Sequence, residues 1–261
     1  MKIIKSKYLH YINDNINIVT NSKPKIYNLY IVYYINCLVN PNYFDWLYYQ
    51  LKLVERFNGT IYIIATLNKR NEEHFMKRCL FHFPDVKISC NYVNEFEYPG
   101  ILKVWELGQI YKDTNDIILY FHSKGVTRNR LYESNKNDNY NIILKDINEI
   151  YDIFTTFPSI DKIGYYSGGI GWIWYNFWYS RGSYIHQVEK PIKTSRRHYY
   201  EDWLSRKVLN GENIVDYERP HSYYPNTLLS CYGFYTDKRI YGNIGSYYCP
   251  NKNKMFNLKI L

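Results

Sequence analysis

Hydrophobic and polar positions in the first half of the chain fall into two alternating patterns. Short runs rich in β-branched and aromatic residues predict buried strands. The runs between them, whose apolar residues recur every three or four positions, predict helices. Phe44, Leu47 and Leu51, for example, fall on one helical face, and Asn58-Gly59 ends that pattern. The predicted strands are residues 25–35, 59–67, 86–93 and 116–121, and the predicted helices between them are residues 43–57, 71–83 and 101–111.

This regular alternation of strand and helix predicts the fold class. Strands joined through helices pair in parallel, with the helices covering both faces of the sheet. We therefore expect an α/β fold with a mostly parallel, Rossmann-like sheet flanked by helices. A length of 261 residues fits one domain of generous size. We expect that domain to cover residues 25–211, after a polar N-terminal segment, residues 1–24, and before a C-terminal extension, residues 212–261, packed on the same domain.

The second half of the chain has a less regular pattern. Ile147, Ile150 and Phe154 form an apolar stripe that predicts a helix over residues 141–157. A short strand is expected near Ile163-Gly164. The aromatic segment 172–179 alternates like a strand, and a helix over 196–211 is closed by Asn210-Gly211.

The composition is dominated by 32 tyrosines beside a single alanine, Ala65. Residues with AT-rich codons are favoured throughout, which we interpret as genome bias, as in low-GC bacteria, some protists or giant viruses. Most of the tyrosines therefore serve as half-buried bulk, and only clustered ones indicate a site.

The charge balance is basic, with 33 lysines and arginines against 24 acidic residues and a net charge of +9. This excess favours phosphate-bearing or polyanionic partners. The lysines are dispersed and no nucleic-acid-binding motif is present, so we do not expect a nucleic-acid partner. A rival hypothesis is a protein that binds single-stranded nucleic acid through its aromatic residues.

The cysteines indicate neither a zinc site nor a disulfide framework, because the five are scattered without a C-x-x-C pair. The N-terminus has no apolar run of signal-peptide length, and no stretch approaches the ~20 apolar residues of a membrane span. We expect a cytoplasmic protein without a membrane span, in the host cytoplasm or the virion if the gene is viral.

The strongest candidate site is the end of the fourth predicted strand. Ligands of open α/β sheets bind at the carboxyl ends of the strands. There the strand runs into His122 and Lys124, with Arg128 close behind, and these cationic groups suit a diphosphate. The alternative is a solvated basic turn. At the ends of the first and second strands, Tyr33, Tyr34 and Thr66 are further candidates.

Two other clusters suit a ligand. Trp172, Trp174 and Trp178, with Asn176 between them, offer flat aromatic faces for a sugar or a base, although large aromatic residues more often fill a core. Glu201-Asp202 offers a carboxylate that could act as a general base. The same pair at a helix N-terminus could simply favour the helix dipole.

Four short motifs, in this order, resemble those of a group of glycosyltransferases with the GT-A fold, found in bacterial surface-polysaccharide clusters and large DNA viruses. The similarity runs from about residue 26 to residue 210. The motifs that carry it are Glu97-Tyr98-Pro99 before Leu102 to Trp105, Tyr120 with His122-Ser123-Lys124-Gly125, Tyr175-Asn176-Phe177-Trp178-Tyr179, and Glu201 with Trp203-Leu204.

The chain departs from the group's pattern at three places. Tyr175 replaces the glycine before Asn-Phe-Trp, and Tyr179 replaces a second tryptophan. The Asp-x-Asp metal motif usual in GT-A enzymes is absent from its expected strand end, where His122-Ser123-Lys124 stands instead.

The resemblance implies transfer of a sugar from a nucleotide-sugar donor to a hydroxyl of a glycan or glycoprotein acceptor, with inversion. Side-chain cations in place of Asp-x-Asp imply that neither a divalent metal nor another cofactor is needed. Glu201 or Asp202 would be the base. A non-catalytic glycan-binding protein of the same fold is the other alternative, and residues 212–261 would cover the acceptor side or mediate formation of a homodimer. The donor would contact Tyr33, Tyr34, Thr66, His122, Lys124 and Arg128, and the sugar or acceptor would contact Trp172, Trp174, Asn176 and Trp178.

Overall fold

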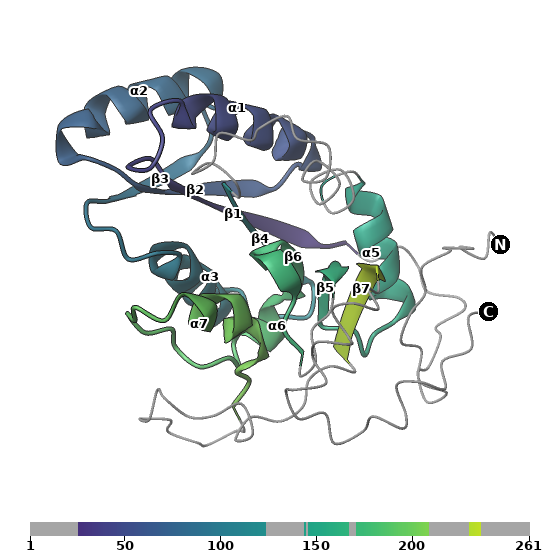
Figure 1. Ribbon diagram of the computed structural model, residues 1–261. Helices are drawn as coiled ribbons and strands as arrows, with labels where there is room; N and C mark the ends of the chain where they lie inside the picture. The colour runs from purple at the N-terminus through teal and green to yellow at the C-terminus, as the bar shows by residue number, and fades with distance from the viewer. Residues whose placement is uncertain (1–25, 124–143, 145, 167–170, 209–229, 236–261) are drawn as a thin grey trace.

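The computed structural model describes residues 26–123, 144, 146–166, 171–208 and 230–235 (Figure 1). These residues form a seven-stranded sheet with the strand order β3-β2-β1-β4-β6-β5-β7. Strands β1 to β4 pair in parallel, β6 pairs antiparallel with both β4 and β5, and β7 pairs in parallel with β5. The strands are β1 (Asn28–Asn36), β2 (Thr60–Thr66), β3 (Lys87–Asn91), β4 (Asp116–His122), β5 (Lys162–Tyr166), β6 (Trp178–Arg181) and β7 (Cys231–Tyr235).

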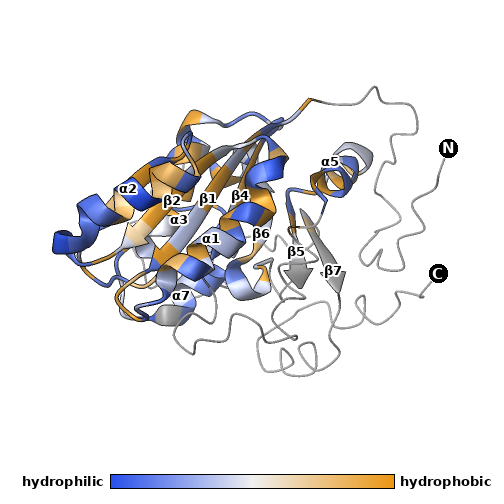
Figure 2. Cartoon of the chain, turned by 90° about the horizontal axis from the view of Figure 1, so that it is seen from above, coloured by the Kyte–Doolittle hydropathy of each residue, from blue (hydrophilic) through white to orange (hydrophobic). Residues whose placement is uncertain are grey.

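Helices cover both faces of this sheet. The α1, α2 and α5 helices lie on one face, and α3, α6 and α7 lie on the other (Figure 1). Hydrophobic residues concentrate in the central strands β1, β2 and β4 between these layers (Figure 2). The predicted α/β class, with a mostly parallel sheet flanked by helices, is thereby confirmed. The helices are α1 (Tyr43–Val54), α2 (Glu72–His82), α3 (Tyr98–Ile110), α5 (Ile147–Thr156), α6 (Gly182–Ile185) and α7 (Arg197–Asp202), with short 3₁₀ turns η1 (Glu55–Phe57), η2 (Lys69–Asn71), η4 (Trp174–Asn176) and η5 (Trp203–Ser205).

Alternate residues of each central strand supply two separate cores. Ile31, Tyr33 and Ile35 of β1 face α1, whereas Val32 and Tyr34 face α3. Because both faces are buried, the central strands carry continuous apolar runs, which is why their positions were predictable from the sequence.

The strand order creates a topological switch point between β1 and β4. The connection that leaves β1 leads to β2 on one side, and the chain that leaves β4 continues to strands on the other side. A crevice forms where two such connections diverge, at the carboxyl ends of the strands. In this protein, that position belongs to Asn36 and His122.

Three predicted elements differ from the structure. The segment 172–179 is not a continuous strand, because Tyr175 and Asn176 have φ angles of 72° and 53° and break the extended backbone. The helix expected over 141–157 begins at Ile147, where the Asp146 carboxylate accepts a hydrogen bond from the Asn148 amide as an N-cap.

The helix expected over 196–211 is also shorter than predicted. It covers α7 and the turn η5, and then the Arg206 carbonyl accepts from the Glu189 amide and Lys207 forms a β-bridge with Val188. The hydrogen bonds with Val188 and Glu189 therefore replace the helical hydrogen bonds that the local pattern favoured.

Strand β7 comes from the predicted extension 212–261, where the sequence showed no clear period. The predicted N-terminal segment 1–24 lies outside the described residues. Across the described residues, no helix has both the length and the apolar character needed to cross a membrane.

Candidate functional site

The candidate site is built on the adjacent ends of β1 and β4. His122, the last residue of β4, is the register partner of Tyr34 in β1. The main-chain amide of Ser123 then donates to the Tyr34 carbonyl over 3.0 Å. The sheet therefore fixes the backbone of this segment up to the point where it leaves the strand.

A single carboxylate joins three of the sequence motifs. Glu97 precedes α3, and its Oε2 accepts hydrogen bonds from the Tyr120 hydroxyl over 3.1 Å and from Asn176 Nδ2 over 2.8 Å. Its Oε1 lies 3.6 Å from Nδ1 of His122. Residues from α3, β4 and η4 thus meet at one side chain that sequence reasoning named in a motif but not as a site residue.

Each nitrogen of the His122 ring faces an oxygen atom that can accept a hydrogen bond. Its Nε2 lies 3.1 Å from the Tyr175 carbonyl, which can only accept, so Nε2 carries a hydrogen. The ring is also parallel to that of Tyr120, with centroids 6.5 Å apart, and packs on Phe177. With 16% of its side chain exposed, His122 borders the site without projecting from it.

Close packing of α3 on the sheet brings Glu97 to this position. A Cβ added at Gly100 would lie 2.8 Å from Cβ of Tyr34 and 3.0 Å from the Tyr120 hydroxyl. Any larger residue would push the start of α3 away from the sheet. Pro99 in the first turn favours the helix start at this point.

The η4 turn places the third motif. Asn176 is buried, and its amide donates to the Tyr200 carbonyl over 3.0 Å as well as to Glu97. This bond ties α7 to the network. Tyr175 has a φ of 72°, a left-handed conformation that glycine adopts without strain and that a side chain disfavours.

The two candidate carboxylates of α7 have different surroundings. Asp202 Oδ1 accepts from Arg206 Nε over 3.1 Å, and Arg206, with 7% of its side chain exposed, also contacts Glu189. Asp202 therefore belongs to a structural ion-pair cluster. The Glu201 side chain is 23% exposed, and its Oε2 lies 3.7 Å from Nδ1 of His198.

Two predicted sugar-binding residues are not placed for that role. Trp178 is fully buried against Tyr120 and offers no face to a ligand. Both described acceptors of the Asn176 amide are protein oxygens, so this side chain organises the site. Trp172 and Trp174 are partly exposed and pack edge to face, with ring centroids 5.9 Å apart.

The predicted donor residues at the ends of β1 and β2 lie beneath the surface. Tyr33 packs on Phe121 in the core, and the Tyr34 hydroxyl shares a buried 3.2 Å hydrogen bond with Thr66. Burial raises the pKa of Tyr34, which stays a neutral phenol. These three side chains support the floor of the site and are not placed to contact a donor directly. Lys124 and Arg128 lie outside the described residues.

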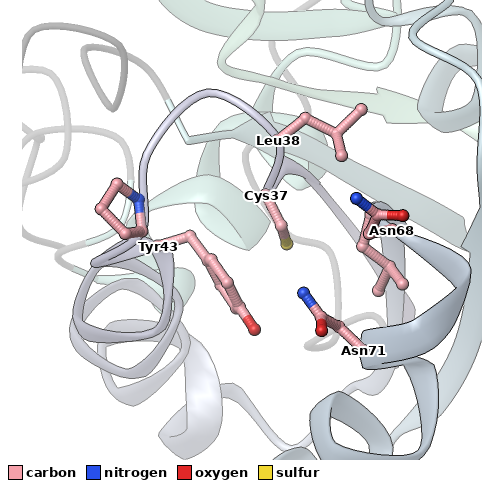
Figure 3. Close-up of a pocket in the computed structure, with 7 residues that line it drawn as sticks. Cys37, Leu38, Tyr43, Asn68 and Asn71 are labelled. Atoms are coloured by element: carbon pink, nitrogen blue, oxygen red, sulfur yellow. The ribbon is translucent and has the colours of Figure 1, made fainter.

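A pocket of about 240 Å³ lies at the same edge of the sheet, beside the ends of β1 and β2. Figure 3 shows the Cys37 thiol, the Tyr43 hydroxyl and the Asn71 carboxamide directed toward one another across it. Burial raises the pKa of the Cys37 thiol, so the lining is uncharged. The sequence pattern pointed to the ends of these two strands, but the candidates named there, Tyr33, Tyr34 and Thr66, do not line the pocket. The lining residues are Cys37, Leu38, Pro41, Tyr43, Leu67, Asn68 and Asn71.

The part of the chain that the structure describes contains no group of three or more His, Cys, Asp or Glu side chains that could hold a metal ion. Glu97 and His122 form a pair, and the pair is engaged by protein donors and acceptors.

Comparisons with known proteins add little to this geometry. No protein-family model and no curated protein matches the sequence. Among solved structures, the chain is similar to the crystal structure of 4-diphosphocytidyl-2C-methyl-D-erythritol synthase from Anaerococcus prevotii, with 10% identity and a TM-score of 0.37 over 73% of this chain and 79% of that chain.

Proposed function

We propose that this protein is a glycosyltransferase that moves a sugar from a nucleotide-sugar donor to a hydroxyl group of a glycan or glycoprotein. The observation that carries the proposal is the hydrogen-bond network of Glu97. It joins three motifs of the glycosyltransferase-like pattern at the switch point of the sheet, where ligands of this fold class bind.

The pocket beside β1 and β2 suits the base of the nucleotide. Its uncharged lining combines apolar surface with the carboxamides of Asn68 and Asn71, each of which can both donate and accept a hydrogen bond. A charged phosphate would find no counter-ion among these lining residues, whereas a planar base with mixed donors and acceptors would find partners.

The diphosphate belongs near the end of β4. His122 lies there at the switch point, and Lys124 follows two residues later in the sequence. Positive side chains at this position would stabilise the negative charge that develops on the departing nucleoside diphosphate, which is the task of the metal in Asp-x-Asp enzymes. We propose transfer without a divalent metal on this ground.

Glu201, the acidic residue of the Glu-x-Trp motif, is the proposed base. Asp202 is assigned a structural role, because its carboxylate accepts from the buried Arg206 guanidinium. In the proposed step, Glu201 takes the proton from the acceptor hydroxyl while the oxygen of that hydroxyl forms a bond to the anomeric carbon. The bond from that carbon to the diphosphate oxygen breaks on the opposite face, and the electron pair leaves with the nucleoside diphosphate. The outcome is inversion at the anomeric carbon. Trp172 and Trp174 are the partly exposed aromatic residues that could cover the sugar.

The test is a thermal-shift screen of the full chain with nucleoside diphosphates and nucleotide sugars, followed by an assay for released nucleoside diphosphate. We expect at least one compound to raise the Tm, since a ligand at 100 times its Kd adds about 2.7 kcal/mol of stability. Asn71→Leu should abolish that shift, and Lys77→Ala, an exposed residue of α2, serves as the control. If no nucleotide sugar binds while oligonucleotides bind in a salt-dependent manner, the proposal is overturned.

A further inference from the structure

Within the proposed function, we infer that Glu97 is a positioning residue that keeps His122 as a fixed imidazolium at the diphosphate end of the site. The inference rests on the contacts of the ring and on the proposed function only for the identity of the anion. In this role Glu97 acts through His122 and does not itself bind the substrate.

The two ring nitrogens of His122 both face oxygen atoms that accept. The Tyr175 carbonyl takes the hydrogen of Nε2, and Oε1 of Glu97 lies 3.6 Å from Nδ1. A neutral imidazole has one N–H, so a neutral ring would turn the Nδ1 lone pair toward a carboxylate. A second proton on Nδ1 replaces that repulsion with an ion pair. The geometry therefore favours the charged ring.

The other titratable groups around the ring support this arrangement. Tyr34 of β1, Tyr120 of β4 and Tyr200 of α7 are phenols whose pKa values are raised by burial, so they remain neutral near pH 7. Glu95, which precedes α3, is paired with Lys193 over 2.6 Å. Among the residues that the structure describes, Glu97 is the carboxylate that lies against the ring.

An imidazolium held in this way acts on the diphosphate through its charge. With Nε2 donating to Tyr175 and Nδ1 paired with Glu97, the ring has no further N–H to give to a phosphate oxygen. This revises the sequence-based expectation that His122 contacts the diphosphate directly. A fixed charge near a developing anion is effective because it needs no reorganisation during the reaction.

The decisive variant is Glu97→Gln. Its side-chain oxygen can still accept from Tyr120 and Asn176, and its amide can donate to Nδ1 of His122, so the contacts persist while the charge is lost. Tyr120→Phe is the matched control, because it removes one hydrogen bond to Glu97 and leaves the carboxylate charge in place.

The primary measurement is the imidazole ¹⁵N and ¹³C chemical shifts of His122 in the full chain between pH 5 and pH 9. We expect the wild-type ring to be doubly protonated at pH 7, and its titration to move by about 1 pH unit or more to lower pH in Glu97→Gln. The Tyr120→Phe titration should follow the wild type. A neutral His122 at pH 7 in the wild type overturns the inference, and this result needs no variant to fold.

Binding of inorganic pyrophosphate, followed by calorimetry at each pH, separates this inference from the proposed function. We expect pyrophosphate affinity to fall about tenfold in wild type as His122 loses its proton, and the fall to occur at lower pH in Glu97→Gln. If the ring titrates as expected but pyrophosphate does not bind at any pH, the role of Glu97 stands and the diphosphate site of the proposed function is overturned. If His122 titrates at the same pH in wild type and in Glu97→Gln, the role of Glu97 is overturned, and the proposed function is not affected by that result.

Discussion

The carboxylate of Glu97 and the carboxamide of Asn176 are joined by a 2.8 Å hydrogen bond although 79 positions separate them in the sequence. The bond connects the residue before α3 to a turn of left-handed backbone that precedes β6. The local sequence placed both residues in motifs but did not indicate that they contact one another. Their contact shows that the start of α3, the end of β4 and the η4 turn form one structural unit.

Asn176→Leu should destabilise the protein by about 2 kcal/mol. The substitution removes the Asn176 donor from the buried Tyr200 carbonyl and from Oε2 of Glu97, which then keeps the Tyr120 hydroxyl as a donor. Buried polar groups that lose a hydrogen-bond partner carry a cost of this size. Urea unfolding measures the change. Asn148→Leu, on the exposed face of α5, is the control and should change stability by less than about 0.5 kcal/mol. Equal effects of the two substitutions would contradict a structural role for Asn176.

Tyr175→Gly should be more stable than Tyr175→Ala by about 1 kcal/mol. Glycine is ordinarily the less stable of the two, but residue 175 has a φ of 72°, where an L side chain is strained by roughly 1–2 kcal/mol. Both variants lose the same packing of the tyrosine ring, so their difference isolates the backbone. Thermal unfolding of the pair provides the measurement, and an alanine variant that is the more stable would argue against the left-handed turn.

Glu201→Gln should lower the rate of nucleoside diphosphate release by about 100-fold or more, with little change in donor binding. Asp202→Ala should instead lower stability by about 1–2 kcal/mol, because the guanidinium of Arg206 loses a partner. Turnover per folded molecule and Tm, measured for both variants, distinguish a base from a structural carboxylate. If Asp202→Ala lowers the rate and Glu201→Gln does not, Asp202 is the base and Glu201 is not.

Lys124→Ala should weaken donor binding about tenfold or more, since the proposed site has no metal to replace the lost charge. Lys77→Ala removes the same charge from an exposed ion pair of α2 and should leave binding unchanged. Isothermal titration with the nucleoside diphosphate found in the screen gives both affinities.

Treatment with EDTA should leave turnover unchanged, and added Mn²⁺ should not raise it. Positive side chains at the end of β4 are proposed to do what a cation between two aspartates does in related chemistry. The assay compares initial rates before and after chelation. Loss of activity that Mn²⁺ restores would show that a metal takes part in the transfer.

Local pattern was sufficient to place the first seven strands and helices. The bounds of β1, β2, β3 and β4 agree with the predicted runs to within a few residues. For β1, β2 and β4 the reason is that a central strand buried on both faces must be apolar along its length. Predictions from the local pattern were wrong where a segment forms hydrogen bonds with residues far away in the sequence. The predicted 196–211 helix ends early because the Arg206 carbonyl pairs with Glu189, a contact that the helical period of the segment does not contain.

The amino-acid order therefore specifies the layered α/β arrangement and the motifs at the strand ends, since periodicity and burial act over a few neighbouring positions. Folding in three dimensions decides which motif side chains meet. Tyr33, Tyr34, Thr66 and Trp178 became support for the site, and Glu97 became its centre. A carboxylate acquires such a role through donors that lie 23 and 79 positions away, and no local period encodes contacts across that separation.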